Sequence, residues 1–165
     1  MSQGPLGWRH ARDPSVLFCC GFGSGFLPKV PGTWGSLVAL GIWWFGLADL
    51  TLWLQLLVCV AAFVVSIVLI DALQRRYGIA DDPAIVVDEF VGLWVVLAGL
   101  PNEWPWVVAG FVVFRGFDIL KPWPISWLDS YLHGGVGVML DDLAAGLCAL
   151  IVVWVVFSAF AQALG

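Results

Sequence analysis

The chain consists of long apolar runs separated by short polar breaks, and this pattern constrains its fold more than any other feature. Apolar residues make up 61% of its 165 residues and charged residues only 12%, whereas an ordinary soluble domain is about 25% charged. A carboxylate near a hydrocarbon phase is costly without a partner. The acids therefore suggest a cation site at a membrane surface. Eight of the twelve gather in the breaks: Asp81, Asp82, Asp88, Glu89, Asp118, Asp129, Asp141 and Asp142.

Five apolar runs are expected to form helices, at residues 34–50, 52–70, 90–100, 106–120 and 143–164. A helix needs about 20 residues to cross a hydrocarbon core of about 30 Å. The second and last runs meet this length, whereas the third and fourth would have to tilt or be buried by their neighbours. We therefore expect an all-α fold, an integral membrane helical bundle of about five helices, some of them short or tilted.

The chain is long enough for one compact domain. We expect a polar N-terminal tail at residues 1–17 and a single membrane-embedded domain at residues 18–165. The net charge of −5 argues against nucleic acid as a partner. The four cysteines form no C-x-x-C pair, which favours small hydrophobic residues over a zinc site or a disulfide framework.

The basic residues predict an orientation in the membrane. With five spans, the Lys and Arg that flank the runs all fall on one side, and the opposite turns around Asp49 and Glu103 contain none. The positive-inside rule places the basic side in the cytoplasm, together with the clustered carboxylates. The flanking basic residues are Arg9, Arg12, Lys29, Arg75, Arg76 and Lys121.

Two pairs of adjacent acids are expected to begin helices, Asp88–Glu89 the third and Asp141–Asp142 the fifth. Acids favour helix N-termini as caps, which would explain one acid at each place. Two pairs in a chain with twelve acids favour a metal site instead. Hard divalent cations such as Mg²⁺ take carboxylate oxygens together with water and substrate phosphate.

Further polar residues surround the end of the fourth run. Arg115, Asp118 and Lys121 are spaced three apart and share one helix face. This spacing is typical either of local salt bridges or of a site in which Asp118 binds metal while the two cations bind phosphate. His133 follows Asp129 in the next loop and is either incidental or a group for proton transfer.

A glycine-rich stretch, GFGSG at 21–25, is followed by PKVPGT at 28–33 and leads into the first helix. Such loops bind phosphate through backbone N–H groups at a helix N-terminus. No Gly-Lys-Ser/Thr closes the stretch, so it is not a P-loop. A simple re-entrant turn explains it nearly as well.

Five motifs follow one another along the chain: GFGSG (21–25), PGTWGS (31–36), VDEFVG (87–92), FRGFDILKPWPI (114–125) and LDSYLHGGVGVMLDDLAAG (128–146). Through these motifs, the chain resembles the phosphatidylglycerophosphatase A family from about residue 18 to its end. This resemblance implies an all-helical, Mg²⁺-dependent phosphatase of the inner membrane. Its lipid substrate would be phosphatidylglycerophosphate, hydrolysed to phosphatidylglycerol and phosphate in the last step of phosphatidylglycerol synthesis.

The implied reaction needs charge neutralisation on the phosphoryl oxygens, an aligned water and a proton for the leaving group. Metal binding is assigned to Asp88, Glu89, Asp118, Asp141 and Asp142. Phosphate binding is assigned to Arg115, Lys121 and Lys29, with Ser24 and Thr33 as further contacts. The candidates for proton transfer are Asp129 and His133.

Two other classes of protein compete with this interpretation. A small cation-coupled transporter would also contain costly acids, but these would be expected mid-span rather than at one surface. A lipid-headgroup transferase would act on a nucleotide-activated diacylglycerol, and its D-x-x-D-G-x-x-A-R pattern is absent from the sequence. Release of phosphate from a lipid monoester would distinguish the three.

Overall fold

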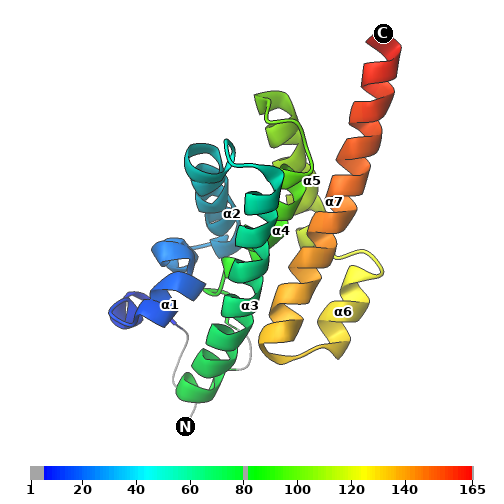
Figure 1. Cartoon of the computed structure of the whole chain (residues 1–165). Coiled ribbons are helices and arrows are strands. Elements are labelled where there is room, and N and C mark those ends of the chain that lie inside the picture. Colours follow the sequence, from blue (N-terminus) through cyan, green and yellow to red (C-terminus); the bar gives the residue numbers. More distant parts are fainter. Residues whose placement is uncertain (1–5, 80–81, 165) are drawn as a thin grey trace.

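The structure, a computed structural model, describes residues 6–79 and 82–164. All regular secondary structure in this part of the chain is helical, which confirms the expected all-α class (Figure 1). Five α-helices correspond to the apolar runs: α2 (Pro31–Ile42), α3 (Leu52–Tyr77), α4 (Val87–Ala98), α5 (Trp104–Leu120) and α7 (Gly134–Leu164). The elements not expected from the sequence are α1 (Pro14–Cys19), α6 (Ile125–Tyr131), the 3₁₀ segments η1 (Trp8–His10) and η2 (Gly21–Phe26), and the π-helical turn η3 (Trp43–Leu47).

The short helix α4 lies at the centre and packs against α2, α3, α5 and α7. Most of its twelve residues are buried, as expected for a helix that is apolar on all sides. The indole Nε1 of Trp94 donates a hydrogen bond to the Ala39 carbonyl of α2 at 2.9 Å. Neighbouring helices therefore cover this short run, as its length predicted.

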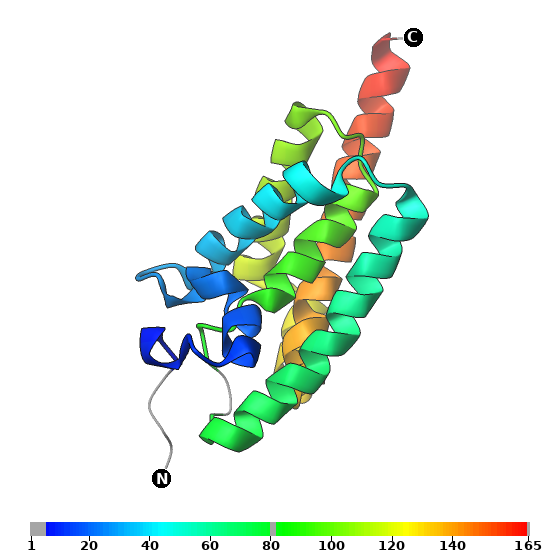
Figure 2. The ribbon, with the colours of Figure 1, turned by 60° about the vertical axis from the view of Figure 1, so that its left-hand side comes forward.

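Two glycines let α4 and α7 come into backbone contact. A Cβ on Gly92 would lie 2.7 Å from the carbonyl oxygen of Asp142, and one on Gly146 would collide with the carbonyl oxygen of Gly92. Small residues allow this close approach between helices. The two helices run in the same direction (Figures 1 and 2). The acids one turn before each glycine, Glu89 on α4 and Asp142 on α7, therefore lie at the same level.

The expected start of the last helix, at residue 143, is wrong: α7 begins at Gly134. The carboxylate of Asp71 on α3 accepts a hydrogen bond from the Gly135 N–H at 2.6 Å and satisfies this helix end. The backbone of Gly135 also lies against Ile67 of α3. Asp141–Asp142 therefore lies about two turns inside α7, so this pair does not cap a helix.

Two helices in the described part of the chain are long and apolar enough to cross a membrane, α3 and α7. At 1.5 Å per residue they are about 39 and about 46 Å long, and only 22% of each apolar window is buried within the protein. The C-terminal turns of α7 project beyond the other helices in both views (Figures 1 and 2). The remaining helices are shorter, so the expectation of about five membrane spans is not confirmed.

The N-terminal residues from 6 onward fold against the rest of the protein, although the sequence suggested a polar tail up to residue 17. Leu6 and Val16 are buried. The carboxylate of Asp82 accepts a hydrogen bond from the Leu6 N–H at 2.7 Å. Asp13 caps α1 and forms an ion pair with Arg76 of α3 at 2.7 Å. Residues 1–5 of the expected tail lie outside the described residues.

The backbone contact between α4 and α7 predicts that one added methyl group at this contact destabilises the protein. We expect Gly146→Ala to lower the free energy of unfolding by about 1–3 kcal/mol, because the added Cβ collides with the α4 backbone. Gly41→Ala in α2 is the matched control, since a Cβ there meets nothing within 4 Å. Thermal unfolding of the purified proteins measures both, and equal midpoints would contradict this account of the contact.

Candidate functional site

A cleft of about 720 Å³ lies where one end of α2, α4 and α5 meets α6 and the N-terminal part of α7. It collects polar residues from six helices, α2 to α7. Ten of the twelve predicted site residues line it: Thr33, Asp88, Glu89, Arg115, Asp118, Lys121, Asp129, His133, Asp141 and Asp142.

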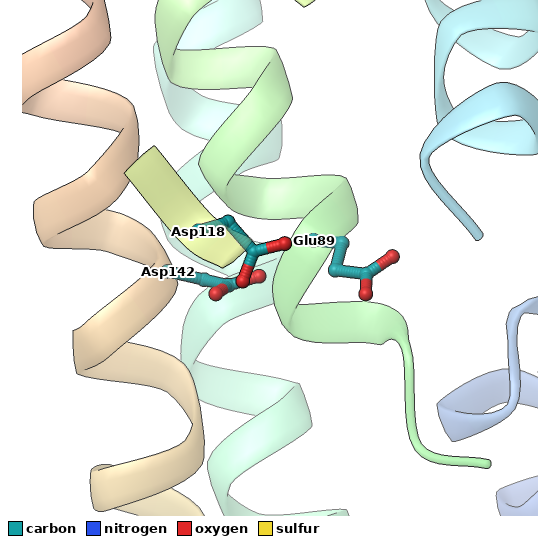
Figure 3. A group of neighbouring side chains, drawn as sticks. All are labelled: Glu89, Asp118 and Asp142. Atoms are coloured by element: carbon teal, nitrogen blue, oxygen red, sulfur yellow. The ribbon is translucent and has the colours of Figure 1, made fainter. Parts of the chain in front are cut away.

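Three carboxylates form the centre of the cleft, and each comes from a different helix (Figure 3). Glu89, Asp118 and Asp142 each offer one oxygen, and these oxygens all lie within 4.8 Å of one another. Oδ2 of Asp142 is buried and has no hydrogen-bond partner among the described residues. A buried charged oxygen without a donor is costly. The set therefore fits a hard divalent cation such as Mg²⁺, which prefers oxygen ligands.

The other two predicted ligands, Asp88 and Asp141, lie beside this group. In each, Oδ1 accepts a hydrogen bond at 3.0 Å from the backbone N–H of the acid that follows, Glu89 or Asp142. Asp141 also forms an ion pair with Lys121. Metal binding by these two acids stays a prediction.

Arg115 supplies positive charge at the centre of the cleft. Its Nη1 lies 3.2 Å from Oε1 of Glu89 and 2.5 Å from Oδ2 of Asp118, so the local ion pair suggested by the i,i+3 spacing does form. Nη2 lies 3.5 Å from the Thr33 hydroxyl. A guanidinium with several donors suits a phosphate group as well as carboxylates.

The PGTWGS segment at the start of α2 holds Glu89 in place. A Cβ on Gly35 would lie 2.8 Å from Oε2 of Glu89, and one on Gly32 would collide with Oε1. The buried hydroxyl of Ser36 lies 3.2 Å from both Oε2 of Glu89 and Nη1 of Arg115. Sequence reasoning missed Ser36, although it lies within a motif that had been identified.

Lys121 follows α5 with φ of 40° and bridges two acids. Its Nζ lies 2.6 Å from Oδ1 of Asp129 and 2.7 Å from Oδ2 of Asp141. Burial alone would lower the pKa of Lys121, but hydrogen bonds to Asp129 and Asp141 outweigh it and raise the pKa above its ordinary value. Asp129 and His133 lie at the exposed rim of the cleft, and their role in proton transfer stays a prediction.

The first turn of α4 lies outside the two membrane-length helices, and its two acids are withdrawn from water. Burial raises the pKa of Glu89 to about 7, although the Arg115 charge opposes the shift. Burial also raises the pKa of Asp88, and the Glu89 charge adds to this effect. Clustered acids of this kind favour a bound cation, because a cation stabilises their charged forms.

The structure does not bring the remaining two predicted residues into the cleft. The Ser24 hydroxyl is buried and donates a hydrogen bond to the Gly21 carbonyl at 2.7 Å, within the GFGSG turn. Lys29 is exposed outside the cleft lining. Gln74 lines the cleft because α3 continues beyond its expected end at residue 70, and its sequence position gave no signal of this.

Comparison with known proteins gives consistent matches over most of the chain. A family model described as phosphatidylglycerophosphatase A matches residues 17–157. A relative of that name from Escherichia coli (strain K12) is 45% identical over 136 residues, which cover 82% of this chain and 78% of the relative. Another from Haemophilus influenzae is 40% identical over 153 residues, which cover 92% and 94%. No solved structure matches the chain.

The carboxylate cluster predicts a measurable affinity for a divalent cation. We expect Asp118→Asn and Asp142→Asn to weaken Mg²⁺ binding by more than about tenfold. Substituting a residue that only hydrogen-bonds to a metal ligand already has an effect of that size, and loss of a ligand should have a larger one. Asp49→Asn, at an exposed turn, is the matched control. Calorimetric titration of the folded proteins measures the affinity. Equal Mg²⁺ affinity in the three variants would exclude the cluster as the binding site.

Proposed function

The chain belongs to the phosphatidylglycerophosphatase A family, and from this premise we propose a Mg²⁺-dependent mechanism in the cleft described above. The family membership makes it a phosphatase of phosphatidylglycerophosphate. The products are phosphatidylglycerol and inorganic phosphate. The bond that breaks joins the terminal phosphorus to the glycerol oxygen, and water supplies the new oxygen.

The observation that carries the mechanism is the meeting of three carboxylates and two cations in one cleft. Glu89, Asp118 and Asp142 would hold Mg²⁺, and their close oxygens support this assignment. When bound, Mg²⁺ would neutralise charge on the phosphoryl oxygens and lower the pKa of a coordinated water. Arg115 and Lys121 would bind the remaining phosphate oxygens, because both cations face the same cleft.

Other residues of the chain would position these groups and move protons. Ser36 lies within hydrogen-bond distance of Glu89 and Arg115 and would fix the geometry of both. Asp129 lies at the rim within reach of Lys121. Together with His133 it would take a proton from the attacking water or give one to the leaving glycerol oxygen.

We further propose that the protein is embedded in the inner membrane and that the headgroup enters the cleft from the lipid phase. The length and exposure of α3 and α7 support the embedding. At the end of α5, Ile119 and Leu120 are 67% and 79% exposed immediately beside Lys121. This juxtaposition of apolar surface and cationic site suits a substrate with acyl chains and a phosphate.

Phosphate release from phosphatidylglycerophosphate by the purified protein tests the mechanism. We expect chelation by EDTA to abolish the activity of the natural chain and added Mg²⁺ to restore it. Asp88→Asn and Asp142→Asn should lose activity by orders of magnitude while remaining folded, because each removes a charge from the site. Asp49→Asn should retain it. Full activity after exhaustive chelation would point to a metal-free reaction, and near-normal turnover in Asp142→Asn would remove that residue from the mechanism.

We also propose the orientation that the basic residues indicate, in which the cleft faces the cytoplasm. This orientation predicts which loops an impermeant thiol reagent reaches. In a chain without the four native cysteines, Asn102→Cys should react in intact cells, whereas Ser130→Cys should react only after the membrane is opened. Both positions are exposed in the structure, and α5 separates them. Labelling of position 130 but not 102 in intact cells would place the cleft on the outer side.

A further inference from the structure

The positive charge of the chain is concentrated in two places. Two of its seven Lys and Arg residues, Arg115 and Lys121, line the cleft. Three others, Arg9, Arg12 and Arg76, line a second pocket of about 420 Å³ that shares no lining residue with the cleft. We call this the basic pocket, and its lining is completed by His10, Asp13, Pro14 and Tyr77.

The basic pocket is held in shape by contacts between the N-terminal segment and the end of α3. Oδ2 of Asp13 accepts hydrogen bonds from Nη1 of Arg76 at 2.7 Å and from the Tyr77 hydroxyl at 3.1 Å. The His10 ring packs edge-on against the Tyr77 ring at 5.2 Å. Asp13 is the one acid among the described residues of the lining, and it pairs with Arg76, so the positive charge of Arg12 stays in excess. Arg75, one residue before Arg76, adds to it.

The basic pocket lies where contact with lipid headgroups is expected. It lies at the last turn of α3, a helix long and apolar enough to cross a membrane. Trp8, next to Arg9 in η1, is 64% exposed, and its ring packs against Phe26 at 5.1 Å between centroids. Phe22 is 59% exposed in the neighbouring turn. Exposed aromatic rings beside arginines are typical of a surface that contacts the headgroup layer.

We propose that the basic pocket binds the phosphate of an anionic phospholipid headgroup, at a site separate from the cleft. The arginines recognise the phosphate, and Trp8 and Phe22 contact the adjoining lipid. This goes beyond the proposed phosphatase reaction: it requires α3 to lie in a membrane but requires no turnover. An arginine near an anionic surface contributes about 1 kcal/mol, which corresponds to roughly a fivefold change in affinity.

Titration of the purified full chain in a non-ionic detergent tests the proposal. The probes are short-chain phosphatidylglycerol, phosphatidylcholine with the same chains, glycerol 3-phosphate and inorganic phosphate. We expect the natural chain to bind phosphatidylglycerol most tightly. The double variant Arg9→Gln/Arg12→Gln should bind it roughly 25-fold more weakly. Added salt should reduce the difference, because the charges are exposed.

Two control variants separate the basic pocket from other sources of affinity. Lys29→Gln removes an exposed cation outside both pockets and should retain nearly full affinity. Arg115→Gln removes the central cation of the cleft, so a loss confined to this variant would place the lipid in the cleft and overturn the proposal. Phosphatidylglycerol has no phosphomonoester to hydrolyse, so the result is independent of the phosphatase activity.

Three further outcomes decide the proposal. Unchanged phosphatidylglycerol affinity in the double variant would overturn it. Equal affinity for phosphatidylcholine, or for inorganic phosphate, would overturn the assignment to an anionic lipid. Should the double variant fail to keep the thermal midpoint of the natural chain, Arg9→Gln and Arg12→Gln are measured singly, and each should bind roughly fivefold more weakly.

Discussion

The backbone contact between Gly92 on α4 and Gly146 on α7 is the constraint on which the site depends. At this contact a Cβ on either glycine would meet the backbone of the other helix, so the two backbones touch directly. Glu89 and Asp142 each lie about one turn before their glycine and are therefore brought to one level. Asp118 reaches the same place from α5. The common level of Glu89 and Asp142 thus follows from packing between two helices, and α5 adds the third carboxylate.

The apolar surroundings strengthen the interactions among the charges in the cleft. Seven of the twelve acids and two of the seven Lys and Arg residues line one cleft in a protein that is mostly apolar. Interactions between charges are stronger where water is scarce, so Arg115 and Lys121 both stabilise the acids and hold them in place. Oδ2 of Asp142, which has no hydrogen-bond partner within residues 6–79 and 82–164, shows that this compensation is incomplete. The cleft is therefore suited to bind a further cation and, through it, an anion.

Much of the fold could be predicted because apolar runs and helices coincide in this chain. The acid pairs and the i,i+3 spacing after Arg115 indicated seven of the residues that line the cleft. The start of α7 could not be predicted, because Asp71 caps it from another helix and the glycines near residue 134 resemble a loop. Ser24 and Lys29 were misplaced for a related reason: a glycine-rich turn has the same local sequence whether it binds a ligand or packs against the protein.

The same glycine contact makes α7 a lever whose pivot lies close to the carboxylate of Asp142. Asp142 lies four residues from Gly146, or about 6 Å along the axis, whereas the helix continues for about 27 Å on the other side. A rotation of α7 about this point moves its C-terminal end several times farther than its carboxylate. With α7 embedded in a membrane as proposed, the unequal distances would insulate the geometry of the cleft from changes in bilayer thickness that tilt the helix, while its C-terminal end adjusts to them.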